Sequence, residues 1–117
     1  IFCPSYTFTE VGFYRVRHCA QARCIENQVY FVHCPTVGDA GKPLSPGYGR
    51  ASILSPCDLA WNPDGVVAEA RTNEHTVITG EVDLDELYVN RESGAATTFR
   101  DRTRRQPMYE KYAPYSK

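Results

Sequence analysis

The sequence lacks a hydrophobic run long enough to cross a membrane, and it lacks a strong excess of either charge. A membrane-spanning helix needs about 20 consecutive apolar residues, and no run in the 117 residues approaches that length. The 13 Lys and Arg residues stand against 14 Asp and Glu, which gives a formal net charge of −1. No overall field therefore draws the chain to nucleic acid or to an acidic membrane. We expect neither of these partners.

The sequence also lacks the cysteine pattern of a disulfide-rich or zinc-binding domain. It has five cysteines, an odd number, with no C-x-x-C pair and no signal peptide pattern, which argues against a disulfide framework. The five-residue spacing between Cys19 and Cys24 fits no zinc site. We therefore expect no metal ion and no cofactor. Reduced cysteines, buried as small apolar residues, are typical of a cytoplasmic protein.

An initiating Met is also absent, because the chain opens on IFCP, in what the pattern predicts to be a strand. This start favours a fragment, a processed chain or an incomplete gene model.

The charges are distributed unevenly along the chain. Residues 1–90 carry six Lys and Arg against eleven Asp and Glu, a net charge of −5, whereas residues 91–117 carry seven against three, a net of +4. A basic tail on an acidic body favours docking, on the chain's own body or on a partner subunit, over nucleic-acid binding. We divide the chain into a body at residues 1–88 and a tail at residues 89–117.

Short apolar runs rich in β-branched and aromatic residues predict five strands. They lie at residues 1–3, 29–34, 51–54, 66–70 and 76–82. The turn residues of WNPDG, at residues 61–65, predict a hairpin between the third and fourth strands. Together with one long helix after the first strand, this order predicts a mixed sheet with helices on one face, an α/β (layered α+β) fold.

Capping patterns predict where two helices begin. Thr7 and Glu10 fit a capping box for the long helix, which we expect to run to about Asn27. Asp83, with Glu86 three residues later, predicts the start of a shorter helix at residues 84–91. One face of the long helix carries an apolar stripe expected to be buried. The stripe consists of Phe13, Val16, Ala20 and Cys24.

Two pairs of residues could be interpreted as a catalytic pair or a substrate contact, but each also has a simpler structural interpretation. His33 and Cys34 are neighbours in a predicted strand, so their side chains point to opposite faces and do not form a catalytic pair. Arg23 and Glu26 are three residues apart on a helix, where a local ion pair or a structural contact to the next loop is favoured over substrate contact.

Several motifs in series resemble the carbon–nitrogen hydrolase (nitrilase) superfamily. AQARCIENQVYFV at residues 20–32 resembles the helix-to-strand segment that follows the active-site cysteine of that family. Four further motifs resemble later segments, in the same order and at plausible spacing. They are GRASILSP at residues 49–56, NPDGVVAEA at 62–70, VITGEVDLDEL at 77–87 and RRQPMY at 104–109.

The resemblance implies the C-terminal part of an α-β-β-α sandwich, with a tail that commonly reaches across to a partner subunit. It therefore implies a homo-oligomer formed through the C-terminal tail. It also implies hydrolysis of a non-peptide C–N bond in a small amide, carbamoyl compound or nitrile.

The family uses a Cys nucleophile, a Glu base and a Lys that stabilises the oxyanion, and the resemblance places all three upstream of Ile1. No catalytic residue is then expected in this chain, and the chain alone is expected to be inactive. Ser5, Tyr6 and Thr7 follow the first strand where the family's chain passes the active site, so they are candidates for the substrate-pocket wall. Residues 35–37 are weaker candidates.

Two alternatives remain open. The first is a non-catalytic partner or regulatory module that retains the family's dimer surface, and it predicts a stable folded dimer without upstream sequence. The second is an unrelated small α/β binding domain, and it predicts a closed sheet with no open edge at residues 1–3.

Overall fold

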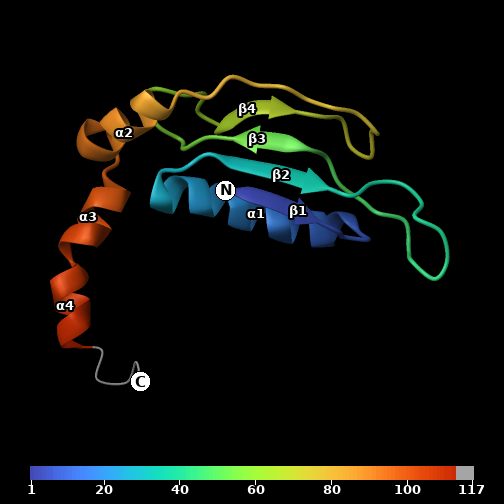
Figure 1. The fold of residues 1–117 in the computed structure, drawn as a ribbon, viewed down its shortest axis with the longest axis horizontal. Coiled ribbons are helices and arrows are strands. Elements are labelled where there is room, and N and C mark those ends of the chain that lie inside the picture. Colours follow the sequence, from blue (N-terminus) through green and yellow to red (C-terminus); the bar gives the residue numbers. More distant parts are fainter. Residues whose placement is uncertain (113–117) are drawn as a thin grey trace.

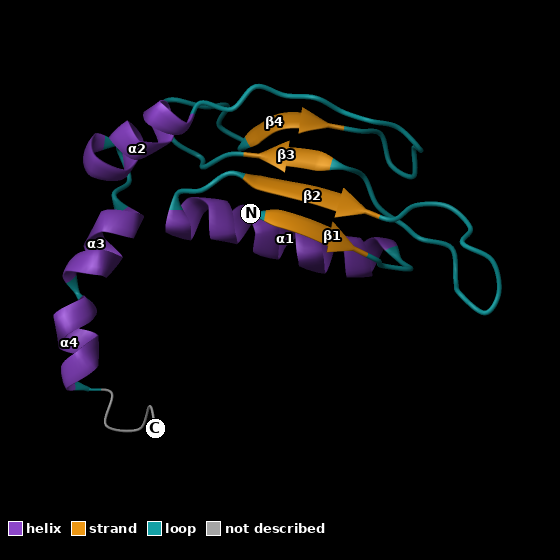
Figure 2. Cartoon of the chain, viewed as in Figure 1, coloured by secondary structure: helices purple, strands orange, loops and turns teal. Residues whose placement is uncertain are grey.

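The computed structural model describes residues 1–112, which form a four-stranded sheet with a long helix on one face and three shorter helices at one end (Figures 1 and 2). This mixture of strands and helices confirms the predicted α/β character of the fold. The strands are β1 (Phe2–Ser5), β2 (Phe31–Pro35), β3 (Ser52–Leu54) and β4 (Val66–Glu69). The helices are α1 (Glu10–Asn27), α2 (Leu84–Ser93), α3 (Thr98–Arg104) and α4 (Gln106–Lys111).

The strands lie in the order β1-β2-β3-β4. β1 and β2 are parallel and are connected through α1, whereas β2–β3 and β3–β4 are antiparallel. Antiparallel neighbours can be joined by short turns, but a parallel pair needs a crossover, which α1 supplies. β1 is an edge strand, so within residues 1–112 the sheet is open there. This open edge contradicts the closed sheet expected for an unrelated small binding domain.

The helix α1 starts two residues later than the capping box predicted. Thr9 is the N-cap, and its hydroxyl accepts a hydrogen bond of 3.1 Å from the Gly12 backbone N–H. The Thr7 hydroxyl instead donates to the Tyr48 carbonyl at 2.7 Å. The predicted box was therefore wrong, because Thr7 is engaged by a loop distant in the sequence. The predicted end of the helix at Asn27 is confirmed.

The core lies between α1 and the sheet. Its buried centre consists of Ala20, Cys24, Phe31 and Leu54, with Cys3 and Val66 packed against it. The predicted helix stripe is correct at three of its four positions. Val16 is only half-buried, and Arg17 is buried in its place. Arg17 lies four residues after Phe13, on the same helix face, so it points at the sheet.

The expectation that the cysteines are buried holds for one of the five. All five are free thiols, but only Cys24 is buried, and Cys3 is half-buried. The other three are exposed: Cys19, Cys34 and Cys57. Cys34 is exposed because it faces the side of the sheet opposite α1.

The predicted fifth strand at residues 76–82 does not form. This segment packs across side chains of β3 and β4 instead of pairing with a strand edge. A Cβ atom added at Gly80 would lie 3.0 Å from Val67 Cγ1 and 3.2 Å from Ile53 Cδ1. The absence of a side chain at Gly80 lets the backbone pass this close to the sheet face.

The helix α2 is predicted correctly at its start. Asp83 is its N-cap, and one carboxylate oxygen accepts backbone hydrogen bonds from Asp85 at 2.8 Å and Glu86 at 3.0 Å. Leu87 and Asn90 are the buried residues of α2. The helix extends to Ser93, two residues beyond the predicted end.

Gln28 joins the C-terminal helices to the body. Its backbone has a left-handed conformation (φ 46°) at the C-cap of α1, and its side chain is buried. The Gln28 amide nitrogen donates to the carbonyls of Asn90 and Ala96, and its amide oxygen accepts from the Phe99 N–H. Arg91 Nε donates to the Gln28 carbonyl at 3.0 Å. One buried amide thus fixes the start of the tail.

Beyond this anchor the tail extends away from the body (Figure 1). The radius of gyration is 17.2 Å, compared with about 13 Å for a compact chain of this length. The sequence reasoning did not predict α3 or α4. Residues 113–117 of the predicted tail lie outside the described residues. None of the described helices is long and apolar enough to span a membrane.

Candidate functional site

The predicted pocket-wall residues Ser5, Tyr6 and Thr7 lie at the carboxyl end of β1. In the parallel register Ser5 is opposite Pro35, and the Thr36 N–H donates to the Ser5 carbonyl at 2.8 Å. The structure therefore brings the two predicted segments, residues 5–7 and 35–37, together at one edge. In open α/β sheets, ligands bind at the carboxyl ends of parallel strands.

The three side chains contact different partners. Ser5 Oγ is joined to His33 Nε2 by a hydrogen bond of 2.8 Å. The Tyr6 hydroxyl donates to the Ser45 carbonyl, and the Thr7 hydroxyl donates to that of Tyr48. Tyr6 and Thr7 thus hold the loop between β2 and β3 against the end of β1. Ser5 is the member of the trio that contacts a titratable side chain.

The sequence indicated His33 only as a neighbour of Cys34 and did not predict its contact with Ser5. His33 is fully buried, and its ring stacks on Phe13 with centroids 5.7 Å apart and an interplanar angle of 11°. Burial, with a smaller contribution from the Arg17 charge, lowers the pKa of His33. Cys34 is exposed on the opposite face, which confirms that the two neighbours form no catalytic pair.

The lowered pKa of His33 predicts acid sensitivity. The unfolded chain binds this proton near the usual pKa of 6.5, whereas the folded chain resists protonation until a lower pH. The stabilisation is therefore fully present above pH 6.5 and is lost as the pH falls toward the folded-state pKa. Urea unfolding followed by circular dichroism across this range should show a falling free energy of unfolding.

A His33→Phe variant provides the test of this assignment, and His75→Gln, at an exposed histidine, is the matched control. The phenylalanine variant should have a shallower dependence on pH below 6.5, and the control should keep the original one. An unchanged slope in the His33 variant would assign the acid sensitivity to other groups.

A polar row crosses the helix-facing side of the sheet next to His33. His33 is opposite Ser52, and Ser52 is opposite Glu69 in the neighbouring strand. The Glu69 carboxylate forms ion pairs with two arginines, Arg17 Nη1 at 2.6 Å and Arg50 Nε at 3.3 Å. The buried Arg17 is thereby neutralised, as burial of a charge requires. Through the ion pair between Glu69 and Arg17, the row connects β2, β3 and β4 to α1.

The sequence did not predict this row, because only apolar residues were assigned to the buried stripe of the long helix. One signal was present in the sequence: Arg17 follows Phe13 by four residues and precedes Ala20 by three, so helical periodicity places it on the buried stripe.

The side of the sheet opposite α1 is apolar and lacks a covering helix within residues 1–112. Phe2 is 84% exposed there. An apolar hollow of about 290 Å³ lies on this face, between the sheet and the segment that replaces the predicted fifth strand. Its lining includes Val32, Cys34, Ile53, Val77 and Ile78. Apolar surface of this kind is typical of a contact with another layer of protein.

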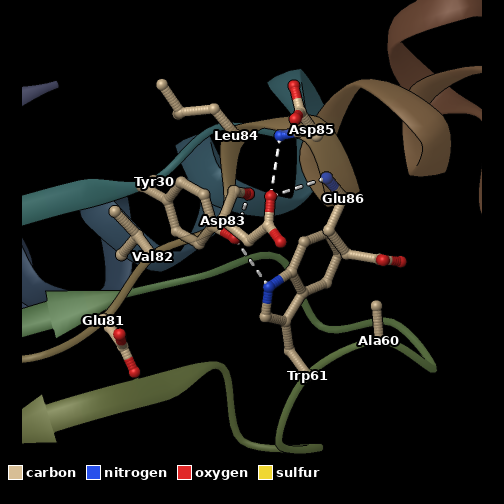
Figure 3. Close-up of a pocket in the computed structure, with 9 residues that line it drawn as sticks. All are labelled: Tyr30, Ala60, Trp61, Glu81, Val82, Asp83, Leu84, Asp85 and Glu86. Carbon is tan, nitrogen blue, oxygen red and sulfur yellow. Dashed lines mark hydrogen bonds between the residues drawn. The ribbon is translucent and has the colours of Figure 1, made fainter.

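A second, larger hollow of about 760 Å³ lies at the start of α2 (Figure 3). The Trp61 indole N–H donates to the Tyr30 hydroxyl at 2.9 Å, and that hydroxyl donates to the Asp83 carbonyl at 2.8 Å. The lining contains four carboxylates and no Lys or Arg. We call this the acidic hollow, and its carboxylates are Glu81, Asp83, Asp85 and Glu86.

The described residues do not assemble a complete reactive site. Burial raises the pKa of Cys24 to about 12, so this thiol stays protonated at neutral pH, and a protonated thiol is a poor nucleophile. The Ser5–His33 pair lacks a third group, because His33 Nδ1 has no hydrogen-bond partner within residues 1–112. Over the same residues, no group of three or more His, Cys, Asp or Glu side chains is arranged to hold a metal ion.

Comparison with known proteins shows similarity to a bacterial protein. The chain is 38% identical over 106 residues to the probable hydrolase YhcX of Bacillus subtilis (strain 168). The alignment covers 89% of this chain and 21% of that protein, so the chain spans about one fifth of the length of the curated relative. No family model and no solved structure matches the chain. The similarity supports a relationship to a hydrolase.

Proposed function

We propose that the protein carrying this chain hydrolyses non-peptide carbon–nitrogen bonds in small amides, carbamoyl compounds or nitriles. In this proposal residues 1–112 form a supporting layer of the enzyme and not its reacting groups. The observation that carries the proposal is the 38% identity, over nearly the whole chain, to a protein named a probable hydrolase. The carbon–nitrogen specificity rests on the order of the resembling motifs.

The face of the sheet opposite α1, which within residues 1–112 carries no helix and only the segment at residues 76–82, supports the layered arrangement. One face is packed under α1, and the other presents Phe2 and the apolar hollow around Cys34. Two sheets packed face to face lie about 10 Å apart and bury such faces between them. A second sheet on this side would complete an α-β-β-α sandwich, with the open edge at β1 extended by further strands.

The reaction would use a Cys nucleophile, a Glu base and a Lys supplied from outside residues 1–117. The base takes the thiol proton, and the thiolate attacks the carbonyl or nitrile carbon. The Lys ammonium stabilises the negative charge that develops on the attacked group. For an amide, the Glu returns the proton to the nitrogen, which leaves as ammonia or amine, and water then cleaves the thioester. Ser5, Tyr6 and Thr7 would form part of the pocket wall.

The test is ammonia release by the full-length protein from a panel of small amides, carbamoyl compounds and nitriles. Activity that disappears when a Cys outside residues 1–117 is changed to Ala would support the proposal. Residues 1–117 expressed alone should release no ammonia, and turnover by that fragment dependent on one of its own cysteines would contradict the placement of the reacting groups. A full-length protein inactive on the whole panel would favour the non-catalytic partner module.

A further inference from the structure

A hydrogen bond from inside the core holds the pocket wall, defined here as residues 5–7. Ser5 Oγ lies 2.8 Å from His33 Nε2. Ser5 is the last residue of β1, which lies at the edge of the sheet, so strand pairing supports it from one side only. The position of the wall therefore depends on contacts with its inner neighbours, and the contact with His33 comes from a fully buried side chain.

Two backbone hydrogen bonds report whether the pocket wall is in place. The Thr36 N–H donates to the Ser5 carbonyl at 2.8 Å, and the Tyr48 N–H donates to the Thr7 carbonyl at 2.7 Å. Both bonds join the wall to the segment between β2 and β3. A movement of the wall away from this segment would break them and expose both amides to water, which makes their hydrogen exchange a measure of local opening.

The His33 ring fits its position only in the neutral form. The neutral ring forms one hydrogen bond, with Ser5, and Nδ1 has no partner within residues 1–112. The hydroxyl of Ser52, opposite His33 on β3, is also without a partner there, so it does not bond to Nδ1. An imidazolium has two N–H donors. The second donor would be buried without an acceptor, which costs free energy.

The charges around His33 also disfavour a protonated ring. The carboxylate of Glu69, two strands away, is already paired with Arg17 and Arg50. The Arg17 charge adds to the effect of burial in lowering the pKa of His33. A protonated ring would therefore gain no free counter-charge within the described part of the chain. The titratable and charged groups on the elements packed around His33 are Cys3 on β1, Arg17 on α1, Tyr48 and Arg50 before β3, and Glu69 on β4.

We propose that His33 is a positioning residue, whose neutral ring holds the pocket wall in place through Ser5 and whose protonation releases the wall. The effect of this release on substrate binding rests on the proposed hydrolysis, whereas the attachment of the wall to His33 does not. When the wall moves away, water reaches the ring, and its pKa returns toward the usual 6.5. Because the open form binds the proton more tightly, the closing equilibrium should weaken by up to about tenfold per pH unit below 6.5.

The experiment measures amide hydrogen exchange of the full-length protein by mass spectrometry at about pH 7.5 and about pH 5.5. The rates are corrected for the intrinsic pH dependence of exchange. Protection of the Thr36 and Tyr48 amides should fall at the lower pH. The reference is the Ala70 N–H, which donates to the Ala51 carbonyl at 2.9 Å at the opposite edge of the sheet. Its protection should remain, because the release is local.

Three variants separate the hydrogen bond from the shape of the ring. His33→Phe keeps an aromatic ring but cannot bond to Ser5, so the wall should be poorly protected at both pH values. His33→Gln supplies an amide nitrogen in place of Nε2 and does not titrate, so it should retain protection at both. Ser5→Ala removes the same bond from the half-buried side and leaves the core intact. The matched control is His18→Gln, at an exposed histidine of α1, which should keep the parent's pH dependence.

Kinetics of the full-length protein on its best substrate from the panel measure the consequence for binding. His33→Phe and Ser5→Ala should each raise KM about fivefold at about pH 7.5, as expected for the loss of one hydrogen bond. The value of kcat should change little, because the reacting groups are proposed to lie outside residues 1–117. The double variant should be no worse than either single variant, since both remove the same bond. His33→Gln should restore the parent's KM.

Several results would overturn the proposal. They are equal wall protection in the parent and His33→Phe, loss of wall protection only together with the Ala70 amide, and a pH dependence that persists in His33→Gln. A full-length protein inactive on the whole panel would remove the proposed hydrolysis, and hydrogen exchange would still decide the role of His33. Changed exchange with an unchanged KM would support the role of His33 and remove residues 5–7 from the pocket. Circular dichroism verifies the fold of each variant.

Discussion

Replacing Glu69 with Ala should lower the free energy of unfolding by about 3 kcal/mol, because the buried Arg17 guanidinium then has no carboxylate partner. Arg17 is 5% exposed and lies 2.6 Å from Glu69, so its charge cannot be solvated by water without opening the helix–sheet contact. Arg50 remains nearby and adds like-charge repulsion. Urea unfolding followed by circular dichroism measures the change.

The matched control is Glu26→Ala, which removes the partner of Arg23 from an exposed ion pair of 3.0 Å. This pair is confirmed as the sequence predicted, but both side chains are more than half exposed, so the loss should be below about 1 kcal/mol. A double variant, Arg17→Met/Glu69→Leu, should recover most of the stability lost in Glu69→Ala, because apolar replacements remove the buried charge. Equal losses from the two Glu variants would show that the Arg17–Glu69 pair is not effectively buried.

Replacing Phe13 with Ala should cost about 4 kcal/mol of unfolding free energy, since it removes a large side chain from a packed core. Phe13 is 2% exposed and lies between α1 and the sheet, stacked on His33. The guanidinium of Arg50 lies over its ring at 5.6 Å, and Tyr48 meets it edge-on. The variant therefore opens a cavity beside the buried polar row.

Phe8→Ala is the control for this prediction. Phe8 is 55% exposed and contacts Tyr6 edge to face, with centroids 4.9 Å apart. Its loss should cost about 1 kcal/mol or less. Because both substitutions remove the same atoms, the difference between the two unfolding free energies isolates the effect of burial. A difference below about 1 kcal/mol would mean that the site around Phe13 collapses to fill the cavity.

The features that the sequence predicted well are those with local causes. The end of α1, the Asp83 cap and the hairpin turn depend on residues within a few positions of each other. The predicted strand at residues 76–82 failed because its partial alternation has a long-range cause: the backbone at Gly80 packs on Val67 and Ile53. The Thr7 cap failed for a similar reason, since Tyr48 engages that hydroxyl from a distant loop.

The candidate site shows the same division. The positions of Ser5, Tyr6 and Thr7 at a strand end follow from the strand prediction. The hydrogen bond between Ser5 and His33 could not be predicted in this way, because it depends on the parallel register of two strands that are separated in the sequence by a whole helix. Glu69 is likewise connected to Arg17 only through the order of the strands in the sheet. The assignment of Ser5, Tyr6 and Thr7 as pocket-wall residues remains a prediction.

The hydrogen-bonded link from Trp61 through Tyr30 to Asp83 has a spectroscopic consequence. Trp61 is the sole tryptophan among the 117 residues, so indole fluorescence from this chain originates at one place, the rim of the acidic hollow. Fraying at the start of α2 moves the Asp83 carbonyl, which accepts a hydrogen bond from the Tyr30 hydroxyl. The same hydroxyl accepts a hydrogen bond from the Trp61 indole N–H. The emission wavelength of the chain is thereby coupled to the order of its second helix, without any attached dye.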